Sequence, residues 1–407
     1  MSDSDVEQEA IEVAEPSAPE TKLSISVSPQ STPVDHLLMQ AIDLGASDVH
    51  IEPASGHARI RLRKGGILEE HLYEGPPCRG LISIIKIRSH MDSERNGSPQ
   101  NGVFSFTQNE VRYSIQASTY PCIHGEKAVL HILRSDALMT LGSLGMSDGQ
   151  VQSVNRLARR PGGLLLVAGP WSSGKTATLY SLATQSSHME SHVITIEDPV
   201  EHRLPGISQG QVNVSAGLTY ETGMRSILRQ DPDVILVGEI LEPATGKLVM
   251  DACLQAGRRV LSSVHTDTAL EAIDWLLSLG LRADGVAHAL SGVVVQRLLR
   301  KLCGNCKEPK RPGPKLVEQI GFPLDPDTTF YVGKGCEACA HTGYKGKTGC
   351  FEVVAITGEM RELIIKKAAP VLMKKALRKQ GVETVRRAGI RKAAQGLTSL
   401  REVVRVT

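Results

Sequence analysis

The 407-residue sequence predicts an α/β protein in which a small α+β domain precedes a larger domain built on a parallel sheet. Two observations lead to this fold class. Between residues 34 and 145, one helical stripe is followed by runs that alternate apolar and polar residues, as half-buried strands do. After residue 160, short and wholly apolar runs alternate with helical segments, and such runs are typical of parallel strands buried on both faces.

The first predicted domain, residues 34–145, begins with a helix and continues with strands. The helix has Leu37, Leu38 and Ile42 on one stripe and ends near Gly45. The run "ARIRLRKGGILEEHL" predicts a hairpin turning at Gly65-Gly66, and "EVRYSIQAST" predicts a further strand. Before this domain, residues 1–33 are acidic and rich in Ser, Pro and Glu, so we expect a disordered tail there.

The second predicted domain, residues 146–407, contains four apolar runs that each end in polar residues. These runs are "GGLLLVAG", "HVITIEDP", "DVILVGEI" and "RVLSSVHT". Because the carboxyl ends of parallel strands form the ligand crevice of an open α/β sheet, the polar residues after these strands are candidates for a site.

A phosphate-binding loop is predicted at "GPWSSGKTATLYS", residues 169–181, which fits the pattern G-x-x-x-x-G-K-[ST] between a strand and a helix. Loop amides and the helix N-terminus would converge on ATP, with Lys175 on the β- and γ-phosphates and Thr176 on Mg²⁺. The alternative is a glycine-rich turn without a ligand. The predicted nucleotide-binding residues are Gly169, Pro170, Trp171, Ser172, Ser173, Gly174, Lys175, Thr176 and Ala177.

Polar residues after the other strands provide candidates for hydrolysis. Glu239 is placed to orient the attacking water or to contribute to the Mg²⁺ shell, and Glu197 stands at a second strand end. His265 follows a further strand, within expected reach of the terminal phosphate. The alternatives are that Glu239 caps a strand and that His265, like most isolated histidines, is structural.

Two C-x-x-C pairs predict a structural zinc site formed by Cys303, Cys306, Cys336 and Cys339. Each pair presents two thiolates to one metal, and two pairs complete a closed tetrahedral shell. The ligands would stabilise an insertion at residues 303–345. Redox-active or unligated cysteines are the alternative.

Composition limits the classes of function. Aromatic residues make up 3% of the chain, which leaves little for stacking nucleic-acid bases, so we expect no nucleic-acid partner. No apolar run approaches the roughly 18 residues that cross a bilayer, and the start is acidic, unlike a secretory signal, so we expect a cytosolic protein. The last fifty or so residues are basic, which suits either a solvated helix face or an anionic partner.

Several sequence blocks together resemble the ATPases that power type II secretion and type IV pilus assembly. The resemblance runs from about residue 34 to the C-terminus. It rests on "ASDVHIEP", "HGEKAVL", "GPWSSGKTATLYS", "ITIEDPVEHRLPGISQGQVN", "RSILRQDPDVILVGEI", "SSVHTDTALEAIDWLL", "VVVQRLLRKLCGNC" and "GCEACAHTGYKGKTG". The cysteine pairs resemble the secretion and pilus-extension branch.

This resemblance implies a hexamer whose subunits contain a small PAS-like domain and a RecA-like ATPase domain. ATP hydrolysis would drive an inner-membrane platform protein from the cytoplasmic side, and the hexamer would be a homo-oligomer or would include a paralogue. It assigns Lys175 and Thr176 to the phosphate loop, Glu197 to the acidic box, Glu239 to the second nucleotide motif and His265 to the histidine box.

The sequence departs from the family pattern at positions that matter for hydrolysis. Trp171 and Ser172 replace a threonine and a glycine of the phosphate loop, and Leu241 replaces an arginine. Gln116 and His131 stand where the family commonly has arginines. An arginine on a transferring phosphoryl group contributes about 10³-fold or more in rate.

These departures leave two further functions open beside the motor. A nucleotide-binding structural or regulatory subunit would bind ATP with little or no hydrolysis. A nucleic-acid translocase would share the ATPase core and the basic end, although the scarcity of aromatic residues argues against it. We favour the motor because Glu197, Glu239 and His265 are present, while Arg225 and Arg229 remain as possible charge stabilisers.

Overall fold

The structure is a computed structural model of the 407-residue chain, and it divides into two compact units between Leu133 and Arg134. It describes residues 22–23, 31–54, 57–64, 66–134, 139–187, 191–321, 323–325 and 327–407. Most of the predicted disordered tail, residues 1–33, therefore lies outside the described residues, as does Gly65 of the predicted hairpin turn.

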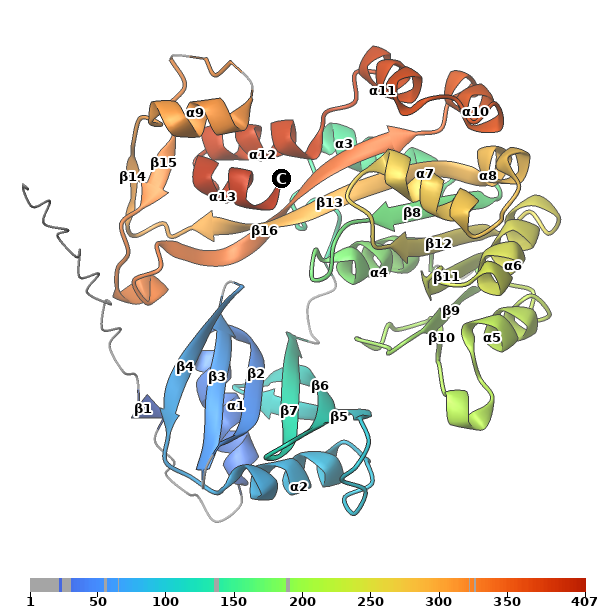
Figure 1. The fold of residues 1–407 in the computed structure, drawn as a ribbon. Helices are drawn as coiled ribbons and strands as arrows, with labels where there is room; N and C mark the ends of the chain where they lie inside the picture. Colours follow the sequence, from blue (N-terminus) through green and yellow to red (C-terminus); the bar gives the residue numbers. More distant parts are fainter. Residues whose placement is uncertain are drawn as a thin grey trace, which may run out of the picture. The chain divides into compact units, whose positions relative to one another are not determined.

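The described residues of the first unit form a seven-stranded sheet and two helices (Figure 1). The strands lie in the order β1-β4-β3-β2-β7-β6-β5. The elements are β1 (Lys22–Leu23), α1 (Pro33–Asp43), β2 (Ala46–Ala54), β3 (His57–Lys64), β4 (Ile67–Tyr73), α2 (Cys78–Arg88), β5 (Gln100–Gln108), β6 (Val111–Cys122) and β7 (Gly125–Arg134).

Local sequence explains the boundaries of this unit's first helix. Thr32 caps α1 by accepting a hydrogen bond from the backbone amide of Asp35, whose carboxylate accepts in return from the amide of Thr32. The helix ends before Gly45, which has a φ of 68°. Leu37 and Leu38 are fully buried against the sheet, so the predicted apolar stripe is the face that packs on the core.

The second unit is built on another seven-stranded sheet. Its order is β10-β9-β11-β12-β8-β13-β16; β9, β11, β12, β8 and β13 run parallel, and β16 is antiparallel to β13. The strands are β8 (Gly163–Ala168), β9 (Val193–Glu197), β10 (Ser208–Gln211), β11 (Val234–Glu239), β12 (Arg259–Val264), β13 (Leu290–Leu302) and β16 (Tyr344–Ala355). A separate two-stranded sheet contains β14 (Lys307–Pro309) and β15 (Tyr331–Gly333).

Helices cover both faces of the second unit's sheet, which explains its apolar strands (Figure 1). On β8, Leu165 and Val167 pack with α3 and α4, whereas Leu164 and Leu166 belong to the core under α6, α7 and α8. The helices are α3 (Asp148–Ala158), α4 (Lys175–Ser186), η1 (Val214–Ala216), α5 (Tyr220–Ile227), α6 (Pro243–Leu254), α7 (Ala269–Ser278), α8 (Ala283–Ala289), α9 (Pro314–Ile320), η2 (Glu337–Cys339), α10 (Gly358–Ile365), α11 (Pro370–Lys379), α12 (Val385–Ala394) and α13 (Leu400–Val406).

The basic C-terminal helices pack on the sheet through a buried carboxylate. Glu402 of α13 is 1% exposed, and its carboxylate accepts hydrogen bonds from the Arg300 guanidinium at 2.8 and 3.0 Å. Arg405 donates two more, at 2.6 and 2.8 Å. Burial alone would raise the pKa of Glu402, but the hydrogen bonds from Arg405 and Arg300 outweigh it and lower the pKa to about 2.

Removing this carboxylate is expected to destabilise the second unit. The folded pKa of Glu402 lies below its ordinary value of 4.5, so its ionised form stabilises the fold above pH 4.5 and loses that effect as the pH falls towards 2. Glu402→Ala should lower the free energy of unfolding by about 3 kcal/mol at neutral pH, because it removes the carboxylate that pairs with Arg300, whose side chain is only 16% exposed. Denaturant titration of the wild type and the variant measures the difference in the free energy of unfolding.

The matched control for this change is Glu318→Ala, at an exposed position on α9. The control should stay within about 0.5 kcal/mol of the wild type. The difference in stability between Glu402→Ala and the wild type should shrink as the pH falls below 4.5. A difference that is negligible at pH 7 would show that the buried pair does not stabilise the fold.

Candidate nucleotide and metal sites

The segment between β8 and α4 forms a tight turn that only certain residues allow. Gly174, the N-cap of α4, has a φ of 84°, in the left-handed region that favours glycine. A Cβ on Gly169 would lie 2.6 Å from both the Gln296 carbonyl oxygen and Ser173 Oγ, so no larger residue fits there without a shift. Ser172 also has a positive φ, 59°, at the position where a glycine was expected from the family pattern.

Lys175 is buried inside this turn and its ammonium group is fully engaged. Its Nζ donates to the carbonyl oxygens of Gly169 and Pro170, each at 3.1 Å, and lies 3.1 Å from His265 Nδ1. Burial lowers the pKa of Lys175 to about 8, so the group is still mostly protonated at neutral pH. The turn's own carbonyls therefore hold the charge that a phosphate group would otherwise take.

His265 and Glu239 meet Lys175 at the carboxyl ends of β12 and β11. His265 Nε2 lies 2.7 Å from Glu239 Oε1. Because a lysine ammonium has only donors, His265 Nδ1 must accept from Lys175, and Nε2 then carries the proton that is donated to Glu239. The three predicted residues Lys175, His265 and Glu239 thus form one hydrogen-bonded chain.

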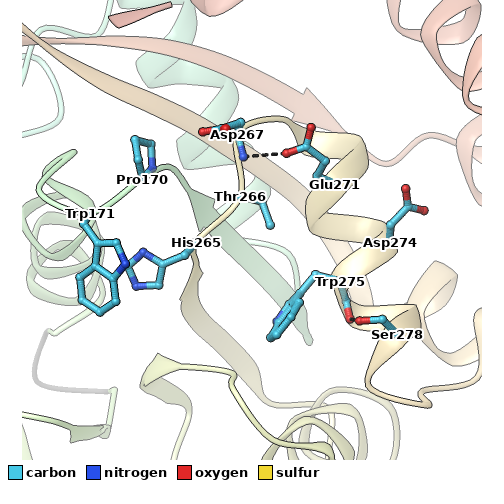
Figure 2. Close-up of a pocket in the computed structure, with 9 residues that line it drawn as sticks. All are labelled: Pro170, Trp171, His265, Thr266, Asp267, Glu271, Asp274, Trp275 and Ser278. Carbon is cyan, nitrogen blue, oxygen red and sulfur yellow. Dashed lines mark hydrogen bonds between the residues drawn. The ribbon is translucent and has the colours of Figure 1, made fainter.

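Trp171 does not occupy the inside of the turn. Its indole is 77% exposed and stacks on the His265 ring, with the ring centroids 3.9 Å apart and the planes inclined by 21° (Figure 2). Both rings border a cleft of about 550 Å³ that is also lined by Pro170 and, on α7, by Glu271 and Trp275. The substitution that distinguishes this loop therefore contacts the predicted histidine.

Glu201 is a site residue that sequence reasoning missed. Thr176 Oγ1 donates to Glu201 Oε1 at 2.8 Å, which brings a carboxylate to the predicted magnesium ligand. Glu201 lies four residues after Glu197 in the loop that follows β9. The available signal was its place in the same polar cluster, "EDPVE", after a buried strand.

Glu197 lies in a different, buried network. It is 3% exposed and accepts hydrogen bonds from Thr195 Oγ1 at 2.5 Å, from Gln209 Nε2 at 3.2 Å and from the Tyr180 hydroxyl of α4. Burial raises the pKa of this carboxyl group. These contacts connect β9 to α4, and none of them reaches Lys175.

The other positions considered for charge stabilisation lie partly in the second unit and partly in the first. Arg225 is exposed on α5 and pairs with Glu221 at 2.8 Å, and Leu241 is 52% exposed. His131, in the first unit, pairs with Asp48 of β2. Gln116 is half-buried on β6.

The four paired cysteines converge on one point. Their Sγ atoms all lie within 4.8 Å of one another, with Cys303–Cys336 and Cys336–Cys339 separations of 3.8 Å and a Cys306–Cys339 separation of 3.9 Å. A tetrahedron with Zn–S bonds of about 2.3 Å has edges of about 3.8 Å, so these thiols fit a tetrahedral zinc ion.

One thiol of this cluster is also prepared to carry negative charge. The amides of Cys336 and Gly343 each donate to Cys339 Sγ at 3.2 Å. Burial alone would raise the pKa of this thiol, but these backbone hydrogen bonds and those from Cys336 and Cys306 lower it to about 6. Thiolates are the form that ligates metal.

Comparison with known proteins identifies the family. Residues 26–405 match the family described as type II/IV secretion system protein. The chain belongs to this family. This secretion-system protein is 37% identical over 376 residues to the type II secretion system protein E of Aeromonas hydrophila, covering 92% of this chain and 75% of that one. It is 35% identical to the type IV pilus assembly ATPase PilB of Thermus thermophilus, covering 91% of this chain but only 42% of that protein.

Solved structures confirm the predicted α/β fold class with its parallel sheet. The Legionella pneumophila ATPase DotB aligns with a TM-score of 0.66 at 18% identity, covering 94% of this secretion-system protein and 98% of that chain. The pilus retraction motor PilT aligns with a TM-score of 0.65 at 23% identity, covering 93% and 97%. At this identity the likeness concerns the fold. None of the described helices combines the length and the apolar character that a membrane span requires.

Proposed function

We propose that this chain is an ATP-hydrolysing motor subunit of a type II secretion or type IV pilus assembly machine. The observation that carries the proposal is the convergence of Lys175, His265 and Glu239 beside a glycine-dependent turn. Family membership supports the same activity, because the matched proteins include an ATPase named for pilus assembly.

Backbone and side-chain groups of the turn would both bind the phosphates of ATP. The backbone amides at the start of α4 would bind phosphate oxygens, as helix N-termini do for anions. The Lys175 ammonium would exchange the carbonyl oxygens of Gly169 and Pro170 for phosphate oxygens, which carry more negative charge. ATP binding is therefore an exchange of partners at a lysine that is already placed and partly desolvated.

Thr176 and Glu201 would hold the magnesium ion of the ATP complex. A hydroxyl and a carboxylate oxygen are both hard oxygen ligands, and here they already lie 2.8 Å apart. Bound Mg²⁺ neutralises charge on the phosphate oxygens.

Glu239 would orient and deprotonate the attacking water, and His265 would position Glu239. The Glu239 side chain is 23% exposed, so water reaches it, and the His265 Nε2–H donates to one of its oxygens, leaving the other for water. Glu197 acts indirectly: it fixes the Tyr180 hydroxyl, and that hydroxyl accepts from the amide of Glu201 at 3.0 Å.

Membership of the secretion-system family supports a proposal for the assembly in which this chain acts. We propose a homo-hexamer, or a hexamer shared with a paralogue, that acts in the cytoplasm on an inner-membrane platform protein. The first unit would be the small PAS-like domain, and the second would be the RecA-like ATPase domain. Four thiols with tetrahedral spacing support a structural Zn²⁺ in the region 303–345.

Phosphate release from ATP by the purified full chain, with and without Mg²⁺, tests the proposal. We expect release that depends on Mg²⁺ and saturates with ATP, with Thr176→Ala and Glu201→Ala each raising the Mg²⁺ concentration required. The control is Gln185→Ala, at an exposed position on the same helix. Thr178→Ala is not a suitable control, because Thr178 is fully buried and donates to Gln296.

A hexamer that binds ATP without releasing phosphate would contradict the motor and favour a nucleotide-binding regulatory subunit. The lack of a cation at Leu241 and Gln116 is the observation behind that second function. In that case, the double change Gln116→Arg with Leu241→Arg should restore measurable turnover.

A further inference from the structure

Trp171 has an orientation that the core does not explain. Its side chain is 77% exposed, and an apolar ring this exposed gains little from burial. The one aromatic contact described for it is the stack on His265, at 3.9 Å and 21°. The chain's other tryptophan, Trp275, is half-buried and donates its Nε1–H to the Ile240 carbonyl oxygen at 3.0 Å. The stack on the His265 imidazole is therefore the main contact that fixes the orientation of the Trp171 indole.

The imidazole of His265 is restrained from three sides. Nε2 contacts Glu239 at 2.7 Å, Nδ1 contacts the Lys175 ammonium at 3.1 Å, and one face of the ring lies against Trp171 (Figure 2). If the Lys175 ammonium exchanged its present partners for phosphate oxygens, as proposed above, the contact at Nδ1 would be lost. Of the three contacts, those with Glu239 and Trp171 would then remain.

We propose that Trp171 is a positioning residue that holds His265 in line with Glu239 while ATP is bound. This inference rests on the proposed ATPase function. A single hydrogen bond at Nε2 leaves the imidazole free to swing about that contact, whereas a stacked ring on its face removes this freedom. Trp171 acts through His265, and its own contact with the reacting atoms is not required.

Steady-state phosphate release by full-length variants tests the inference. Trp171→Ala should lower kcat about tenfold, the size of effect expected from losing a favourable aromatic pair, with KM for ATP within about twofold of the wild type. Trp171→Phe, which keeps a flat ring, should recover most of the lost kcat. Because position 171 is exposed, the unfolding midpoint of both variants should stay at the wild-type value. A change in the midpoint would reveal misfolding.

The double variant Trp171→Ala with His265→Ala shows whether Trp171 acts through His265. We expect its kcat to equal that of His265→Ala alone, because the tryptophan has nothing left to position. A kcat for Trp171→Ala equal to the wild type, or a double variant that loses the full product of the two single effects, would overturn the inference.

A fluorescence measurement keeps the inference testable whether or not the wild type hydrolyses ATP. In a Trp275→Phe background, Trp171 is the sole tryptophan of the chain. Removing His265 in that background should increase quenching of Trp171 by acrylamide, because the covered face of the indole becomes accessible. Unchanged quenching would overturn the stack itself. Absent turnover with a normal quenching response would instead defeat only the proposed ATPase function.

Discussion

Replacing Glu239 by glutamine is expected to lower kcat for phosphate release by about 10³-fold while ATP binding stays within about threefold of the wild type. Glutamine retains an oxygen that accepts from His265 Nε2–H, which lies 2.7 Å from Glu239 Oε1 in the wild type, so the hydrogen-bonded chain to Lys175 is preserved. It cannot accept a proton from water, and a positioned general base contributes about 10²–10⁴-fold. Single-turnover phosphate release and equilibrium ATP binding measure the two quantities separately.

The control for this change is Glu242→Gln, three residues further along the same loop. Glu242 is exposed and makes no capping hydrogen bond at the start of α6, so the same chemical change should leave kcat within twofold. If Glu239→Gln hydrolyses ATP at the wild-type rate, Glu239 is a strand cap and another group activates the water. If it loses ATP binding instead, Glu239 is a ligand of the nucleotide complex.

The position of the site followed from a simple property of parallel strands. The four apolar runs predicted as strands became β8, β9, β11 and β12, and their carboxyl ends share one edge of the sheet. Because side chains after such strands must be close in space, the meeting of Lys175, Glu239 and His265 could be expected from residues far apart in sequence. The pattern of the phosphate loop added the expectation that the ligand is a nucleotide.

The partners of individual side chains could not be predicted in the same way. Glu197 is the last residue of β9 and Glu201 follows four residues later, and the sequence does not distinguish which of them faces Thr176. The strand β9 ends at Glu197, whose carboxylate accepts a hydrogen bond from Thr195 of the same strand. Glu201 lies in the loop after β9 and contacts Thr176 of α4. Loop conformation, which has no periodic signal, decides this difference.

The orientation of Trp171 could not be predicted from the sequence either. A large residue in a loop that must approach phosphate closely suggests obstruction when only the sequence is considered. The positive φ of the next residue, Ser172, is part of a turn in which the indole lies outward against His265. The direction of one side chain thus changes its interpretation from an obstacle to a contact with the predicted catalytic group.

Replacing Cys336 by serine is expected to remove most of the bound zinc and to destabilise the region 303–345. The wild type, purified without chelator, should contain about one Zn²⁺ per chain, because four thiols lie within 4.8 Å of one another with tetrahedral separations. Metal binding contributes directly to the stability of the segments that it joins. Loss of one ligand should therefore cost about 3 kcal/mol, measured by denaturant titration alongside elemental analysis.

An exposed cysteine outside the cluster provides the control for this experiment. Cys122→Ser, on β6 of the first unit, makes the same atomic change and should alter neither zinc content nor stability. Since the cysteine cluster joins β14, β15 and the short helix at Cys339 rather than the residues around Lys175, zinc loss should affect stability and assembly more than the affinity for ATP. A wild type that is free of metal yet as stable as the zinc-loaded protein would exclude a structural role for zinc.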